Sequence, residues 1–300
     1  MATAALVLFC GAGAVSGQEP APSPGQAKSL ADPARPPADT PKPDAKPDPN
    51  ALVGSRIALG ESNLQSIRYT ASGTLANSAD RDAKDAPPTA IGSYDVVIDY
   101  PASTMQIDVV SLAGADPAAP LAHHLEAING TIAWDSEFVT MPTREPAQKR
   151  TRAKPAERFA PTSAAPRLDG ATSVLRRQAI WMTPHGFLKA AMSNQPALRV
   201  AGSGTEVSFY AGPHRYVGFL NSKHQVERVR TWIRRPELGD LLVDTTYTDY
   251  AQFGDITFPT RIRQLQNGRP VLDLTVTGVE ANPPVHIPVP KNVGEAAIAP

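Results

Sequence analysis

Residues 261–276 read Arg261-Ile262-Arg263-Gln264-Leu265-Gln266-Asn267-Gly268-Arg269-Pro270-Val271-Leu272-Asp273-Leu274-Thr275-Val276. Two runs of alternating apolar and polar side chains flank the pair Asn267-Gly268. Alternation with a period of two is typical of a strand with one buried face. An Asn-Gly pair suits the two positive-φ positions of a type I′ turn. The stretch therefore predicts a β-hairpin.

The same pattern recurs along the rest of the chain. Asn129-Gly130 joins a run ending at Ile128 to Thr131-Ile132-Ala133-Trp134, which predicts a second hairpin with a type I′ turn. Other short β-branched and aromatic runs, separated by turn residues, cover 64–75, 94–100, 105–112, 206–210, 215–220, 226–233 and 243–250. Because consecutive strands with short connections tend to be neighbours in a sheet, we expect an antiparallel meander.

Helical patterns are scarcer. Residues 51–62 predict a helix before the first strand, and residues 172–192 carry apolar side chains at spacings of three and four. Pro184 should end the first helix of the second region near Met182, with another helix across 187–193. A sheet of eight or more strands curls and needs an apolar cover on its concave face. The predicted fold class is α+β: a curved antiparallel sheet, or half-barrel, with residues 181–192 as a helical lid on the concave face.

Composition limits the partners and the chemistry. Lys+Arg 29 balance Asp+Glu 29, so no overall field favours nucleic acid or an anionic membrane, and nucleic acid is not an expected partner. The single cysteine, Cys10, rules out a disulfide framework and a Cys-based zinc or iron-sulfur site. A hydrophobic fraction of 41% is enough for a core, whereas the 31 prolines and 21 glycines indicate that part of the chain is non-globular.

Several segments differ from the rest in composition. In residues 1–17 an apolar run is followed by small residues, which predicts a signal peptide. The apolar run is shorter than the about 20 residues that a transmembrane helix needs, and no later segment is predicted to be a transmembrane helix. Residues 18–50 predict a Pro-rich disordered linker, and residues 144–167 a disordered basic insertion. The folded domain is expected over 51–290, with a tail at 291–300. The predicted location is the periplasm or the cell exterior.

The sequence lacks a recognisable catalytic pattern. None of its six histidines forms a His-x-His-x-Asp-His or His-Glu-x-x-His motif. His123 and His124 are adjacent, and on a strand they would point to opposite faces. Gly202-Ser203-Gly204 lacks the nucleophile-elbow pattern and predicts a hairpin loop. We therefore expect no catalytic residue, no metal and no cofactor.

Aromatic side chains are the remaining candidates for a site. They concentrate on the predicted sheet and its lid, and a curved sheet can either close on its own helix or admit an acyl chain. Plain core packing is the simpler interpretation of the two. The candidate ligand-binding residues are Trp134, Trp181, Phe187, Trp232 and Tyr247.

Two resemblances to known families add to these patterns. Residues 243–279, with Phe253-Gly254-Asp255-Ile256-Thr257-Phe258-Pro259-Thr260-Arg261-Ile262, resemble the C-terminal strands of LolA/LolB-like periplasmic proteins, which are half-barrels that carry lipoprotein acyl chains. Residues 51–290 more closely resemble the N-terminal accessory domain of exported metallo-β-lactamase-fold hydrolases. That resemblance rests on Gln178-Ala179-Ile180-Trp181-Met182-Thr183-Pro184-His185-Gly186-Phe187-Leu188-Lys189-Ala190-Ala191, Val226-Glu227-Arg228-Val229-Arg230-Thr231-Trp232-Ile233, Leu238-Gly239-Asp240 and Phe258-Pro259-Thr260. The zinc-binding histidine motif that follows this domain in that family does not occur in the sequence, so the resemblance carries over neither hydrolase activity nor a metal.

The residues and the resemblances leave three functions open. The leading hypothesis is an exported, non-enzymatic module that binds a hydrophobic ligand, a lipid or acyl chain, or a partner protein. The alternative is an accessory domain of a metallo-β-lactamase-fold hydrolase, with the zinc hydrolase domain supplied by a separate chain. The third is a metal-dependent enzyme that binds zinc through His123 and His124. A lipid that accompanies the purified protein would favour the first.

Overall fold

The computed structural model describes residues 46–76, 88–111, 121–140, 164–167, 170–235 and 239–298. The predicted signal peptide, most of the predicted linker and most of the predicted basic insertion lie outside these residues. Residues 164–167, at the end of that insertion, form a short strand. The fold can therefore be assigned for the predicted domain and for the start of the predicted tail.

One open antiparallel sheet contains all thirteen strands of the described residues. Its first half comprises β1 (Ser66–Leu75), β2 (Thr89–Asp99), β3 (Thr104–Ser111), β4 (Leu121–Asn129), β5 (Ile132–Thr140) and β6 (Ala164–Arg167). Its second half comprises β7 (Ala197–Ala201), β8 (Gly204–Ala211), β9 (His214–Leu220), β10 (Val226–Arg235), β11 (Gly239–Phe253), β12 (Ile256–Gln266) and β13 (Arg269–Ala281). The predicted antiparallel meander is confirmed.

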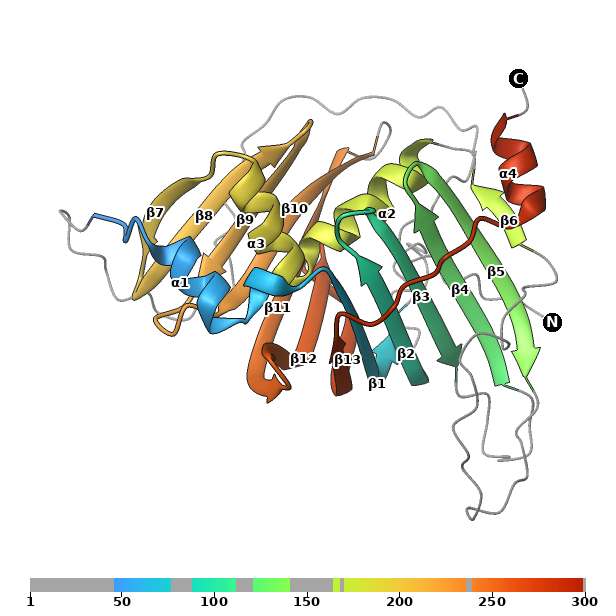
Figure 1. The fold of residues 1–300 in the computed structure, drawn as a ribbon, viewed down its shortest axis with the longest axis horizontal. Coiled ribbons are helices and arrows are strands. Elements are labelled where there is room, and N and C mark those ends of the chain that lie inside the picture. Colours follow the sequence, from blue (N-terminus) through green and yellow to red (C-terminus); the bar gives the residue numbers. More distant parts are fainter. Residues whose placement is uncertain are drawn as a thin grey trace, which may run out of the picture.

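The strand order places the first and last strands together. Each half is a meander, and β1 pairs with β13 in the middle of the sheet, so β6 and β7 become the two edges (Figure 1). This seam joins residues about two hundred positions apart, for example Ile67 with Ala281. The sheet is therefore complete only when both ends of the domain are in place.

The helices connect and flank the sheet. Helix α1 (Ala51–Ala58) and the 3-10 turn η1 (Glu61–Asn63) precede β1. Helices α2 (Gly170–Met182) and α3 (Pro184–Ser193) connect the two edge strands, and the sheet bends around them (Figure 1). The predicted break before Pro184 is confirmed, because Pro184 is the first residue of α3. No helix in the described ranges is long and apolar enough to cross a membrane.

The two predicted Asn-Gly turns differ. Asn267 and Gly268 have φ of 46° and 80° between the paired residues Gln266 and Arg269, which confirms the type I′ turn. The prediction for the first turn is wrong by one residue. Asn129 pairs with Ile132, so Gly130 and Thr131 form the turn and Gly130 alone has positive φ, the pattern of a type II′ turn. Asn129 stays in the strand, where its side-chain amide donates to the carbonyl of Ile287 at 2.9 Å.

Each face of the sheet has its own core. The face that packs against α2 and α3, called here the helix-covered face, carries the main core, which includes Ile67, Val96, Phe187 and Phe258. The opposite face carries a smaller core: Leu125, Ala127, Trp134, Ile287 and Val293. Its last two members come from the segment after β13, which crosses the sheet to helix α4 (Lys291–Ile298) (Figure 1). Residues 291–298, assigned to a tail from the sequence, thus pack on β5 and β6.

Candidate functional site

A cavity of about 60 Å³ lies on the helix-covered face, between the α2–α3 junction and the middle of the sheet. Its lining is mainly apolar: Val96, Ile98, Met105, Ile107, Ala179, Met182, Pro184, Phe258, Ile262, Leu272 and Leu274. Six polar but uncharged residues complete it: Tyr69, Tyr94, Thr183, Thr245, Tyr247 and Gln264. The described lining includes no charged side chain. This combination of an apolar wall and a few polar groups is typical of small-molecule sites.

The β1–β13 seam brings these residues together. Tyr69 on β1 lies opposite Val96 on β2, and on the other side of the seam Leu274 on β13 lies opposite Ile262 on β12. Gln264 in turn lies opposite Thr245 on β11. Because side chains two residues apart share a face, register alone sets these residues in rows under the helices.

The α2–α3 junction closes the cavity through a tight local structure. The hydroxyl of Thr183 donates to the Ile180 carbonyl at 2.8 Å and accepts from the Gly186 amide at 3.2 Å, so it caps α3. A Cβ on Gly186 would overlap the Ile180 carbonyl oxygen, which explains the glycine. Tyr100 also hydrogen-bonds Thr183, at 3.3 Å. The Tyr100 bond ties the junction to the end of β2.

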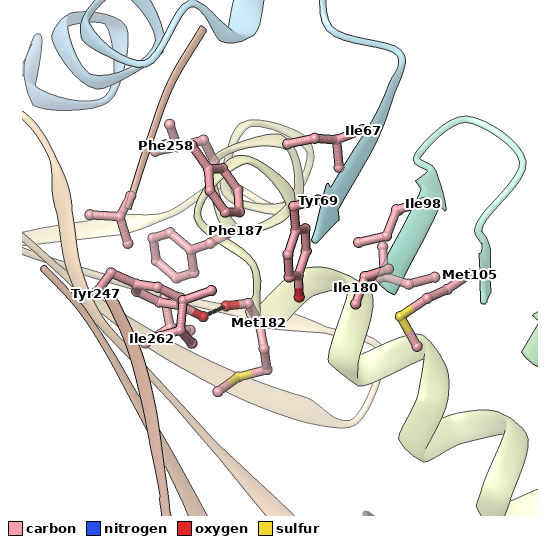
Figure 2. Close-up of a cluster of buried hydrophobic side chains, with 14 of the residues drawn as sticks. Ile67, Tyr69, Ile98, Met105, Ile180, Met182, Phe187, Tyr247, Phe258 and Ile262 are labelled. Atoms are coloured by element: carbon pink, nitrogen blue, oxygen red, sulfur yellow. Dashed lines mark hydrogen bonds between the residues drawn. The ribbon is translucent and has the colours of Figure 1, made fainter. Parts of the chain in front are cut away.

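Two polar contacts involve side chains of the cavity wall, and the second reaches this junction. The side-chain amide of Gln264 donates from Nε2 to the Thr245 hydroxyl at 3.2 Å. The Tyr247 hydroxyl donates to the main-chain carbonyl of Met182, the last residue of α2, and Figure 2 shows this contact between strand and helix. Burial raises the pKa of Tyr247 and of Tyr94 well above its ordinary range. These phenols are therefore neutral hydrogen-bonding groups at any physiological pH.

A buried ionic cluster anchors α2 to β4 and β5. Arg176, 3% exposed, forms ion pairs with Asp135 and Glu126, and it also donates to the carbonyls of Ala127 and Trp134 at 2.8 and 2.6 Å. Breaking a buried pair of this kind leaves an uncompensated charge and costs about 3–5 kcal/mol. The cluster therefore keeps α2 against this half of the sheet.

A second ionic cluster anchors α3 to the segment before β1. Glu61, 2% exposed, pairs with Arg56 and accepts from Lys189 Nζ at 2.5 Å. His185 Nε2 lies 3.0 Å from the Leu59 carbonyl, and burial lowers the pKa of His185 to about 4. The imidazole is neutral and donates this bond. Both helices are thus held at several points.

The structure brings only some of the five predicted site residues to the cavity. Tyr247 lines it, and Phe187 is fully buried beside it, against Gly218, where a Cβ would overlap the ring. Trp181 packs partly buried against the main core without lining the cavity. Trp134 belongs to the small core of the opposite face. Figure 2 shows Phe187 and Met182 from the helices meeting Tyr69 and Tyr247 from the strands.

Trp232 also lies on the opposite face, because its neighbours Thr231 and Ile233 are buried on the helix-covered side. The guanidinium of Arg215 stacks over its ring at 5.2 Å from the centroid. Residue type alone groups Trp134 and Trp232 with the other candidate site residues. Their position in the strand relative to buried neighbours places them on the opposite face of the sheet.

Sequence reasoning missed the polar lining of the cavity. The strand pattern alone predicts only that Thr245 and Gln264 lie on strands. The sequence does carry a signal for Gln264. It lies two residues from the apolar Ile262 and so shares its face of the strand, where the alternating pattern would place another apolar residue.

The two adjacent histidines do not form a joint metal site. The ring of His123 lies 3.1 Å from Asp108 and stacks on Phe138, whereas His124 faces Glu126, which also pairs with Arg176 under α2. They point to opposite faces, as predicted, so one ion could not bind both. No group of three or more metal-ligating side chains occurs within the described ranges.

Comparisons with known proteins give only weak likenesses to solved structures. No protein-family model and no curated protein matches the chain. A LolA superfamily protein from Nitrosomonas europaea is similar with a TM-score of 0.41 and 12% identity over 80% of this chain and 96% of that one. A DUF1329 family protein from Desulfovibrio piger gives 0.44 and 9% over 81% and 96%. Neither likeness identifies a ligand, and the relation to metallo-β-lactamase-fold hydrolases stays a prediction.

Proposed function

We propose that this chain is a non-enzymatic binding module that holds an apolar ligand, a lipid or acyl chain, between the sheet and helices α2 and α3. The observation that carries the proposal is the cavity itself, which is lined mainly by apolar side chains at the centre of the helix-covered face. We further propose that the module acts outside the cytoplasm, since residues 1–17 have the composition of a signal peptide.

The size of the cavity determines how binding would occur. A volume of about 60 Å³ falls well below the roughly 300–1,000 Å³ of sites for drug-sized ligands. An acyl chain therefore needs α2 and α3 to move away from the sheet, so the two helices act as a lid. The Tyr247 bond to Met182 and the two ionic clusters are the contacts that hold the lid closed.

The test is a pair of variants at neighbouring positions on β2. Val96 lines the cavity, whereas Val97 points to the opposite face. We expect Val96→Phe to fill the cavity and lower the affinity for a neutral naphthylamine probe at least tenfold, whereas Val97→Phe leaves it unchanged. Fluorescence titration measures the affinity, and circular dichroism checks that both variants fold.

A second cavity-filling variant, Ala179→Leu on α2, covers the case in which Val96→Phe does not fold. Native mass spectrometry and organic extraction of the purified protein add an independent readout. A wild-type protein that binds no neutral probe and carries no extractable lipid would sink the proposal. Equal affinity in the Val96 and Val97 variants would place the binding elsewhere.

A further inference from the structure

Gln264 lines the cavity and has one unsatisfied polar atom. Its residue is 8% exposed, and its Oε1 is buried without a hydrogen-bond partner. Among the cavity-lining residues that the structure describes, no other has a buried side-chain nitrogen or oxygen in this condition. A buried acceptor left unpaired is destabilising, so a ligand that supplies a donor to it is favoured over one of the same shape that does not.

The hydrogen bond to Thr245 sets the direction of the Gln264 amide. Gln264 Nε2 donates to the Thr245 hydroxyl at 3.2 Å. The other amide atom, Gln264 Oε1, is left as an acceptor without a partner.

The remaining lining excludes charge on the ligand. No Lys, Arg, His, Asp or Glu occurs in the described lining. An ionised carboxylate, phosphate or ammonium at this depth would be buried without a counter-charge, which is far more costly than an unpaired neutral group. The polar end of a ligand that reaches Gln264 must therefore be uncharged.

We infer that the ligand is an uncharged aliphatic molecule carrying a hydrogen-bond donor, a hydroxyl or an amide N–H, and that Gln264 Oε1 accepts this donor inside the cavity. This inference rests on the proposed function, since it assigns the ligand class of the same cavity. It also makes Gln264 the residue that sets specificity. The bond would connect the ligand, through the Gln264 side chain, to Thr245 on β11.

The experiment compares 1-dodecanol with its methyl ether, which keeps the oxygen and the chain but lacks the donor. Displacement of the neutral naphthylamine probe gives both affinities. We expect the wild-type protein to bind the alcohol about tenfold more tightly than the ether, the size of one buried hydrogen bond. Dodecanoate at pH 8 should bind more weakly than the alcohol.

Two variants on β12 test the residue. Gln264→Met removes the acceptor at similar size, and we expect it to abolish the preference for the alcohol over the ether. Gln266→Met is the matched control: the same residue type on the same face of the same strand, buried but outside the lining. It should keep the preference. If Gln264→Met does not fold, the ratio of the wild-type affinities for the alcohol and the ether still tests the inference.

The outcomes separate the two claims. Equal affinity for the alcohol and the ether in the wild-type protein overturns the assignment of Gln264 while leaving an apolar site in place. Tighter binding of dodecanoate overturns the inferred neutrality of the ligand. Failure of all three compounds to displace the probe, in a protein that also carries no lipid, overturns the proposed function as well.

Discussion

His185 is a fully buried histidine whose environment favours the neutral ring. Burial lowers the pKa of His185 to about 4, from an ordinary value near 6.5. Between these values the unfolded chain binds a proton that the folded protein does not, so His185 makes stability fall as pH falls through this window. His124 acts in the opposite sense: burial opposes its charging, but Glu126, Asp135 and Glu137 outweigh burial and raise the pKa of His124.

The predicted consequence is a pH-dependent loss of stability that one substitution removes. We expect His185→Gln, which keeps a donor near the Leu59 carbonyl, to lose about 2–3 kcal/mol less than the wild type between pH 7.5 and pH 4.5. Urea denaturation at the two pH values measures this difference. His286→Gln, at an exposed position, is the control and should lose as much as the wild type. Identical losses in all three proteins would contradict the assignment.

At the scale of elements, α2 depends on hydrogen bonds from the sheet. Tyr247 donates to the carbonyl of Met182, at the end of α2. We predict that Tyr247→Phe lowers the free energy of unfolding by about 1 kcal/mol and speeds uptake of the neutral probe about fivefold, since α2 loses one hydrogen bond to the sheet. Stopped-flow fluorescence measures the uptake rate.

Tyr250 provides the matched control for this prediction. Its hydroxyl donates to the Val226 carbonyl within the strands, away from α2. Tyr250→Phe should cost similar stability without a change in the uptake rate. Equal acceleration in both variants would show that general loosening of the protein, rather than release of α2, controls access.

Sequence patterns predicted elements better than they predicted the site. Alternation placed the strands, and Pro184 located the break between the two helices. The turn at Asn129 shifted by one residue because a long-range bond to Ile287 holds that side chain in the strand. Parity could single out Gln264 as a polar residue on an apolar face, but not its pairing with Thr245, since only the strand register sets the two opposite each other.

At the scale of the whole molecule, the segment after β13 covers the opposite face of the sheet. Ile287 and Val293 complete the small core around Trp134. We predict that ending the chain after Pro284 exposes Trp134, shifts its fluorescence emission to longer wavelength and lowers the unfolding temperature by several degrees. Probe binding should persist in the truncated protein, because the cavity is on the other face. Loss of probe binding with an intact fold would show that the two faces are coupled.

The connection between the two edge strands has a consequence for how room could be made for a ligand. Helices α2 and α3 contain 13 and 10 residues, which at 1.5 Å per residue is about 35 Å of helix. The thirteen strands span twelve spacings of about 4.8 Å, an arc of about 58 Å. The sheet is thus a curved arc, and the helix pair spans it with both ends joined to the edge strands β6 and β7. Because both ends are joined in this way, the helix pair cannot rotate away from the sheet about one end. It can move outward only by bending at Thr183, which brings the edge strands closer together. The sheet of the ligand-bound protein should therefore be more curved than that of the free protein.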